Sequence, residues 1–227
     1  MGKRAGFERS ELPSTPSSYL LPPADLPPRP LAHLLKPAKI VLIPTLVGLN
    51  LVMGWIVVAT KLPIFLDSIG ITIAAILAGP WVAIIVAAAT CLLGTVMFSP
   101  VLWAFTGTAA LIGVLSYLFA TRGFYRRWYL AILAGFLIGI AAAAVSAPVA
   151  AYVFGGATAT GIDAITLAFH SAGKSILEAT FLSGFTSEQL DKPLASFLAY
   201  VLVHRISRRT LAWFPGADRR IWGDTPA

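Results

Sequence analysis

The sequence predicts an all-α fold: a polytopic membrane protein with a six-helix transmembrane bundle and a re-entrant or interfacial segment before the last helix. Hydrophobic residues make up 57% of the chain and charged residues only 12%, whereas a soluble domain carries about 25% charged residues. Several apolar runs are long enough to cross a bilayer, and most of the excess positive charge lies outside them. Together these observations favour a membrane protein.

The net charge of +7 is distributed unevenly along the chain. Residues 1–39 hold six Lys/Arg and three acids, residues 204–227 hold five and two, and the 164 residues between them hold six and five. Basic residues beside apolar segments are typical of the cytoplasmic face of a membrane protein. We therefore expect localisation in the cell membrane with both termini in the cytoplasm, and no nucleic-acid partner.

Residues 1–39 contain eight of the sixteen prolines and no apolar stretch that would form the core of a signal peptide. This composition is typical of an extended, partly polyproline II chain. The chain thus divides into three predicted parts. These are a disordered, proline-rich cytoplasmic tail at 1–39, a transmembrane substrate-binding domain at 40–206 and a basic cytoplasmic tail at 207–227.

Five apolar runs follow the N-terminal tail. The first has 21 residues without a charge, which at about 1.5 Å per residue is enough to cross a hydrocarbon core about 30 Å thick. Lys61 and Pro63 end this run, and the turn Gly79-Pro80 ends the shorter second run. The predicted helices are residues 40–60, 66–78, 81–98, 101–120 and 128–154.

The number of crossings follows from the charges, because Lys and Arg stay on the cytoplasmic side. Four crossings return the chain to the cytoplasm at Arg122, and the fifth leads out to Gly155, so one more must bring Arg205 inside. Residues 191–206 are the preferred sixth helix. Residues 164–185 carry His, Lys and Glu, which a re-entrant or surface segment tolerates and a lipid-facing span does not. The alternative, in which 164–185 crosses and 191–206 lies along the inner surface, stays open.

The chain carries no recognisable catalytic signature. It has no G-x-S-x-G, Walker A or H-E-x-x-H string, and its three histidines lie far apart in the sequence. The single cysteine, Cys91, supplies neither an intramolecular disulfide nor a thiolate metal cage. We therefore expect no enzyme activity, no catalytic residue, no metal site and no cofactor.

Polar and aromatic residues on the outer side of the bundle are the candidate ligand contacts, since an ionisable group at membrane depth is costly and by default functional. On the first five helices these are Asn50, Trp55, Asp67, Trp103 and Tyr152. Further along, His170, Lys174 and Glu178 are spaced i, i+4, i+8, so on one helix they form a stripe that binds a polar solute. Together the eight residues predict an outward-facing substrate pocket.

Several of these residues also fit ordinary structural roles. Lys174 and Glu178 can neutralise each other on a buried helix, and Asp67 can cap the helix that follows it. Trp55 and Trp103 fit an interfacial aromatic belt as well as a stacking platform for a ligand. The sequence does not decide between these roles and ligand contact.

Small residues are frequent within the predicted helices. Gly135 and Gly139 form a GxxxG pair, and Ala74 and Ala78 repeat this spacing. Such faces let two helices approach closely. We expect these faces to pack within the bundle, with contact to a partner protein as the less favoured use.

Three features occur together in residues 40–206. The string LPIFLDSIG precedes a GPW turn, the helices at 101–154 are rich in small residues, and Asp191-Lys192 opens the last predicted helix. In these features the chain resembles the substrate-binding S-components of energy-coupling-factor (ECF) transporters, which are small membrane proteins that capture vitamins. The family's A-x-x-x-A pattern is absent from the first helix, where Asn50 and Gly54 have that spacing.

The resemblance implies a six-helix bundle with both termini in the cytoplasm. It also implies a vitamin-like small molecule bound near the outer face, beneath the loop between the first two helices. The implied partners are a transmembrane T-component and two ATPase subunits, together with the lipid bilayer. The leading hypothesis is thus a solute-capture subunit of an ECF-type ABC transporter. The alternatives are a membrane sensor or assembly subunit acting through its tails, and an ion-coupled carrier, which the lack of inverted repeats disfavours.

Overall fold

The computed structural model describes residues 37–60, 62–158 and 160–223, so most of the predicted N-terminal tail lies outside the described residues. No strand occurs in this described part of the chain, which confirms the predicted all-α class. The elements, where η marks a 3-10 helix, are α1 Pro37–Thr60, α2 Ile69–Ala78, α3 Pro80–Met97, η2 Pro100–Phe105, α4 Thr106–Thr121, η3 Phe124–Arg126, α5 Trp128–Phe154, α6 Asp163–Ser171, α7 Ile176–Arg205, α8 Arg208–Leu211 and α9 Ala217–Trp222.

Within the described ranges, four helical segments are long and apolar enough to cross a membrane. They are Lys39–Thr60, Pro80–Met97, Pro100–Thr121 and Trp128–Phe154. The outer surfaces of the helices are apolar, as at Val96, which is 85% exposed, while Asn50 and Asp191 are completely buried. Water favours the opposite distribution. Apolar exteriors around buried polar groups are compatible with a membrane-embedded protein.

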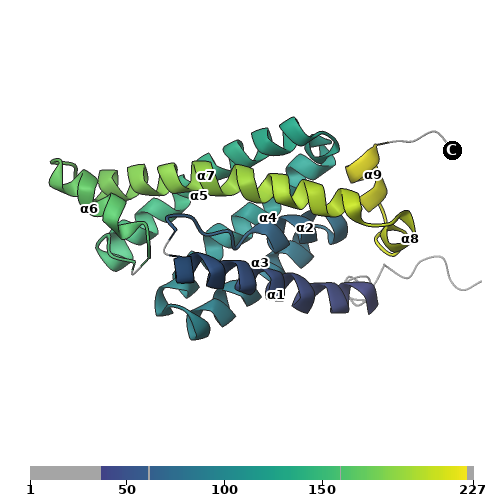
Figure 1. The fold of residues 1–227 in the computed structure, drawn as a ribbon, viewed down its shortest axis with the longest axis horizontal. Helices are drawn as coiled ribbons and strands as arrows, with labels where there is room; N and C mark the ends of the chain where they lie inside the picture. Colours follow the sequence, from purple (N-terminus) through teal and green to yellow (C-terminus); the bar gives the residue numbers. More distant parts are fainter. Residues whose placement is uncertain (1–36, 61, 159, 224–227) are drawn as a thin grey trace, which may run out of the picture.

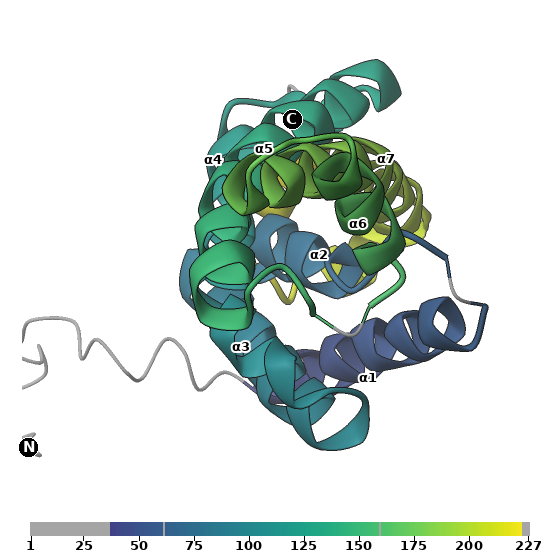
Figure 2. The same ribbon diagram turned by 90° about the vertical axis from the view of Figure 1, so that its left-hand side faces the viewer.

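Helix α2 forms the centre of the molecule. All its residues from Ile69 to Leu77 are buried, and it packs against α1, α3, α4 and α7. Figure 2 shows α2 enclosed by the longer helices. Its ten residues extend only about 15 Å, which is half of a hydrocarbon core. Its burial therefore depends on the longer helices around it.

Asn50 fixes α1 against α2 and α3. Its side-chain oxygen accepts the Gly70 N–H at 2.7 Å, and its amide nitrogen donates to Thr90 Oγ1 at 3.1 Å. A Cβ at Gly70 would lie 2.8 Å from Asn50 Oδ1, so only glycine permits this approach of α2 to α1. The polar residue in the middle of the first apolar run is thus a buried helix connector.

The largest helix-to-helix interface joins α5 and α7, which run side by side in Figure 1. A Cβ at Gly135 would lie 2.5 Å from the Lys192 carbonyl oxygen and 2.6 Å from Pro193 N. A Cβ at Gly139 would lie 2.9 Å from the Glu188 carbonyl oxygen. The two glycines therefore let the backbones of α5 and α7 approach closely, and the predicted packing of the GxxxG pair within the bundle is confirmed.

The predicted boundaries in the C-terminal third are wrong. The sequence predicts separate segments at 164–185 and 191–206, but the chain breaks earlier, between α6 and α7, and then continues as one helix of 30 residues. At the break, Gly173 has a φ of +89°, which favours glycine. Ser175 and Glu178 then form a capping box that starts α7. The predicted re-entrant segment is not confirmed.

The C-terminal segment folds back over one end of the bundle (Figure 1). Arg220 Nε donates to the Ile76 carbonyl at 2.6 Å, and its Nη2 donates to the Leu77 carbonyl at 3.0 Å, so α9 satisfies carbonyls at the end of α2. Burial lowers the pKa of the Arg220 guanidinium, although an arginine stays charged at neutral pH. The arginines that follow α4 and the one that ends α7 gather at this end with those of α8 and α9.

Candidate functional site

Two adjoining cavities lie at the end of the bundle opposite α8 and α9. The α5–α7 cavity has a volume of about 90 Å³ and is lined mainly from η2, α4, α5 and α7. The α1–α3 cavity has a volume of about 400 Å³ and is lined mainly from α1, α3 and the segment 62–67. Both share the lining residues Phe65, Asp67, Cys91, Leu102, Thr160 and Ile162. Together they have the size of a small-molecule site, which spans roughly 300–1,000 Å³.

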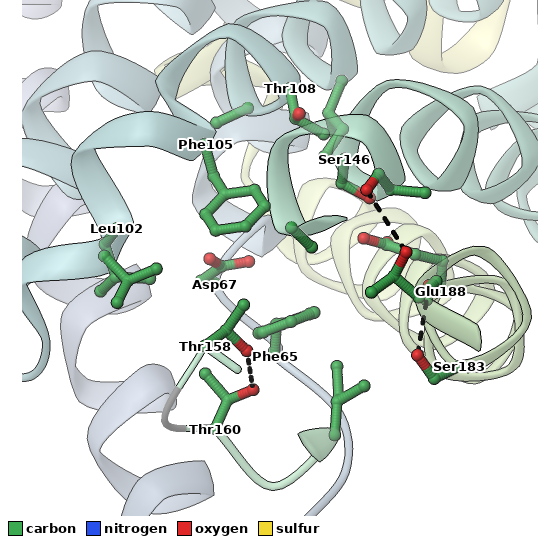
Figure 3. Close-up of a pocket in the computed structure, with 18 of the residues that line it drawn as sticks. Phe65, Asp67, Leu102, Phe105, Thr108, Ser146, Thr158, Thr160, Ser183 and Glu188 are labelled. Atoms are coloured by element: carbon green, nitrogen blue, oxygen red, sulfur yellow. Dashed lines mark hydrogen bonds between the residues drawn. The ribbon is translucent and has the colours of Figure 1, made fainter. Parts of the chain in front are cut away.

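Asp67 lies where the two cavities meet. Figure 3 shows its carboxylate between the rings of Phe65 and Phe105. Ser68, not Asp67, occupies the N-cap position of α2, so the structure does not give Asp67 the capping role. The carboxylate still lies close to the first turn of α2, where the helix dipole favours negative charge.

The middle of α7 contributes a cluster of three ionisable side chains, all buried. Lys192 Nζ forms an ion pair with Glu188 Oε2 at 3.0 Å and another with Asp191 Oδ2. The ammonium group also lies 5.8 Å from the centre of the Phe65 ring, within the range of a cation–π interaction. Glu188 and Lys192 line the α5–α7 cavity, so this cluster faces the candidate site.

The same part of α7 holds the segment that precedes α2. Ser187 Oγ donates to the Pro63 carbonyl at 2.7 Å, and Asp191 Oδ1 accepts the Leu66 N–H at 2.7 Å. Leu66 has a φ of +49°, a left-handed conformation that costs a non-glycine residue about 1–3 kcal/mol. The two hydrogen bonds hold this conformation, and with it the position of Asp67.

A second segment, the loop between α5 and α6, also lines the cavities. Gly155 and Gly156 turn the chain with φ values of +60° and +85°. Asp163 Oδ1 then accepts the Thr158 N–H at 3.0 Å and the Thr158 hydroxyl at 2.7 Å. The hydroxyls of Thr158 and Thr160 lie 2.9 Å apart (Figure 3). This loop therefore brings hydroxyl groups to the cavity wall.

The structure brings two of the eight predicted site residues to the cavities. Asn50 lines the α1–α3 cavity and Asp67 lines both. Trp55, Trp103 and Tyr152 are 61%, 58% and 76% exposed on the outside of the helices and line neither cavity. Their contact with a ligand stays a prediction, and their exposure fits the aromatic-belt alternative.

The predicted stripe of His170, Lys174 and Glu178 does not form on one helix. His170 belongs to α6, Lys174 lies in the break, and Glu178 caps α7. Instead, a His170 ring nitrogen contacts the Lys174 carbonyl at 2.9 Å. All three side chains are exposed and line neither cavity, so their role in binding also stays a prediction.

Glu188, Lys192 and Thr108 all line the α5–α7 cavity, and none of them is among the eight predicted site residues. A signal exists for the first two. Glu188, Asp191 and Lys192 place three ionisable groups within five positions, beside an apolar run, and such groups are costly at membrane depth. Thr108 carries no such signal, because a threonine is common in an apolar helix.

The described residues form an all-helical protein with an apolar exterior and a pair of cavities of small-molecule size. Comparisons with protein-family models, curated proteins and solved structures give no match for this chain. The function is therefore argued from the cavities and from the distribution of charge.

Proposed function

We propose that the protein is the substrate-capture subunit of an ECF-type ABC transporter and that it binds a vitamin-like micronutrient with high affinity. The observation that carries this proposal is the pair of adjoining cavities that share Asp67. They combine apolar and aromatic walls with a few polar groups, which is the usual composition of a small-molecule site. The segment before α2 and the loop after α5 both contribute to their walls.

In the proposed arrangement, α2 and α7 complete a six-helix bundle with α1, α3, α4 and α5. Helix α7 has 30 residues, about 45 Å. The three ionisable side chains in its middle, Glu188, Asp191 and Lys192, are buried, so this part of the helix does not expose charge to lipid. Helix α6 is the interfacial segment. It lies beside the cavities, far from α8 and α9 (Figure 1).

The charge distribution supports an orientation for this bundle. The arginines of the described chain gather around the ends of α4 and α7 and in α8 and α9, and such excess belongs on the cytoplasmic side. We place both termini there and the cavities towards the outer face of the cell membrane. A captured solute then needs partners to release it inward, for which we propose a transmembrane T-component and two ATPase subunits.

A cavity-filling variant tests the proposal. Gly184 lines the α5–α7 cavity, and a Cβ there would have Ser146 Oγ, at 4.0 Å, as its nearest neighbour. The substitution Gly184→Leu therefore adds a side chain at the cavity wall, and its Cβ has no closer neighbour on another helix. Gly107→Leu is the matched control, since Gly107 is also helical but is exposed with nothing within 4 Å of its Cβ position.

The measurement is thermal stabilisation of the purified full chain by a panel of vitamins and their precursors, because a ligand of the folded state raises the unfolding temperature. We expect at least one compound to stabilise the parent and Gly107→Leu, and to lose this effect in Gly184→Leu. If no compound stabilises the parent, or if Gly184→Leu responds like the parent, the proposal is wrong.

The folded C-terminal segment favours one second candidate, a membrane sensor or assembly subunit that acts through its cytoplasmic tails. Arg220 joins α9 to the end of α2 by two hydrogen bonds. A partner that binds α9 would therefore contact a segment that is bonded to the central helix. Deletion of residues 1–36 separates the two functions. Solute uptake survives this deletion if the protein is a capture subunit, and function is lost if the tail carries the activity.

A further inference from the structure

We propose that the ligand of the cavities is a small organic cation, with a protonated or quaternary nitrogen that binds beside Asp67. This inference rests on the proposed function and names the substrate class of the same site. It follows from the charges around the cavities, from the aromatic rings beside Asp67, and from a buried hydroxyl group without a partner.

Acidic side chains outnumber basic ones around the cavities. Asp67, Glu188 and Lys192 line the α5–α7 cavity. Asp191 does not line it but forms an ion pair with Lys192. Three carboxylates therefore share one ammonium group. Lys192 is already in ion pairs with Glu188 and Asp191, so Asp67 is the carboxylate whose charge is least matched. A charged group away from water needs a counter-charge, and a cationic ligand supplies one.

The walls beside Asp67 suit a cation as well. The rings of Phe65 and Phe105 lie on either side of its carboxylate in Figure 3. Aromatic faces attract cations, and this attraction is stronger where water is excluded. An anionic ligand gains nothing from these rings and is repelled by Asp67 and Glu188.

Thr108 gives a second, independent indication that a polar ligand binds here. Its side chain lines the α5–α7 cavity and is 5% exposed, and its hydroxyl makes no hydrogen bond with any other described residue. A buried hydroxyl without a partner is costly. A ligand with an amine or ring nitrogen offers that partner.

Three probes of similar size test the charge preference: benzylammonium, benzyl alcohol and benzoate. Their dissociation constants are measured from the concentration dependence of the unfolding temperature of the purified full chain. We expect benzylammonium to bind about tenfold more tightly than benzyl alcohol, and benzoate to bind most weakly. This preference should disappear in Gly184→Leu, whose cavity is filled.

Asp67→Asn keeps the shape of the side chain and removes its charge. We expect this variant to bind benzylammonium about tenfold more weakly than the parent does, which corresponds to about 1.4 kcal/mol, and to keep its affinity for benzyl alcohol. Asp218→Asn is the control, because it removes the same charge from an exposed position in α9 at the opposite end. It should behave like the parent.

The inference is overturned if the parent binds benzyl alcohol or benzoate at least as tightly as benzylammonium. This comparison needs no variant, so it holds even if Asp67→Asn does not fold. The inference is also overturned if the micronutrient that stabilises the parent is neutral or anionic, and in that case the capture function stands. If no micronutrient stabilises the parent, the proposed capture function itself is wrong.

Discussion

Asn50 shows how a single polar residue organises the core. It accepts from the Gly70 backbone and donates to Thr90, so Asn50→Ala leaves a buried N–H and a buried hydroxyl without their partners. We expect a loss of about 1–3 kcal/mol in the free energy of unfolding, seen as a lower unfolding temperature in detergent.

Thr90→Ala provides the comparison for Asn50→Ala. It removes the hydrogen bond from the Asn50 amide and leaves the bond to Gly70 in place, so its cost should be clearly smaller. Equal stabilities of the parent and Asn50→Ala would contradict the proposed role of this residue as a helix connector.

At the scale of single residues, the sequence predicts the polar residues of the cavities better than it predicts aromatic ones. Asn50 and Asp67 stand out because each interrupts an apolar run, and both line the cavities. Trp55 and Trp103 lie on the outside of the helices, because the same aromatic ring suits a ligand or the membrane interface. Only the direction of the side chain distinguishes these two roles, and a sequence does not contain it.

The segment between α1 and α2 is held by α7, and this contact yields a prediction at the scale of elements. Ser187→Ala removes the hydrogen bond to the Pro63 carbonyl. We expect faster amide hydrogen exchange in residues 64–68, because local opening becomes easier. Thr186→Ala, in the exposed neighbouring position, should leave the exchange of these amides unchanged. Equal exchange in both variants would show that Ser187 does not hold the segment.

The close approach of α5 and α7 gives a second prediction for elements. A Cβ at Gly135 meets the backbone of Lys192 and Pro193, so Gly135→Ala should force the helices apart and cost about 1–3 kcal/mol of stability. Gly107→Ala has open space and should stabilise the protein slightly, by up to about 1 kcal/mol. Thermal unfolding of the two variants checks this difference, and a neutral Gly135→Ala would contradict it.

Most helices are predicted from hydropathy, because apolar residues fill them without interruption. The predicted helices at 40–60, 81–98 and 128–154 match α1, α3 and α5 to within a few residues. Hydropathy does not predict the full length of α7, because the inward face of this helix carries serines and ionisable residues. In addition, a proline such as Pro193 is common at the start of a helix. In the structure Pro193 lies within α7 beside Gly135.

The orientation of the whole molecule is open to a direct test. Cys91 is buried, and Cys91→Ala gives a background for single cysteines at exposed positions. In intact cells, we expect a membrane-impermeant maleimide to label Ser171→Cys, at the end of α6, and to label Arg209→Cys, in α8, only after lysis. The reverse pattern would place the basic end outside and contradict the proposed topology.

The central claim, that the adjoining cavities hold a solute, is tested most directly by native mass spectrometry of the gently purified full chain. We predict that the parent and Gly107→Leu retain one small molecule of the same mass, and that Gly184→Leu has lost it. Retention of that molecule by Gly184→Leu at the level of the parent, or an absence of any bound molecule in all three proteins, would contradict the claim.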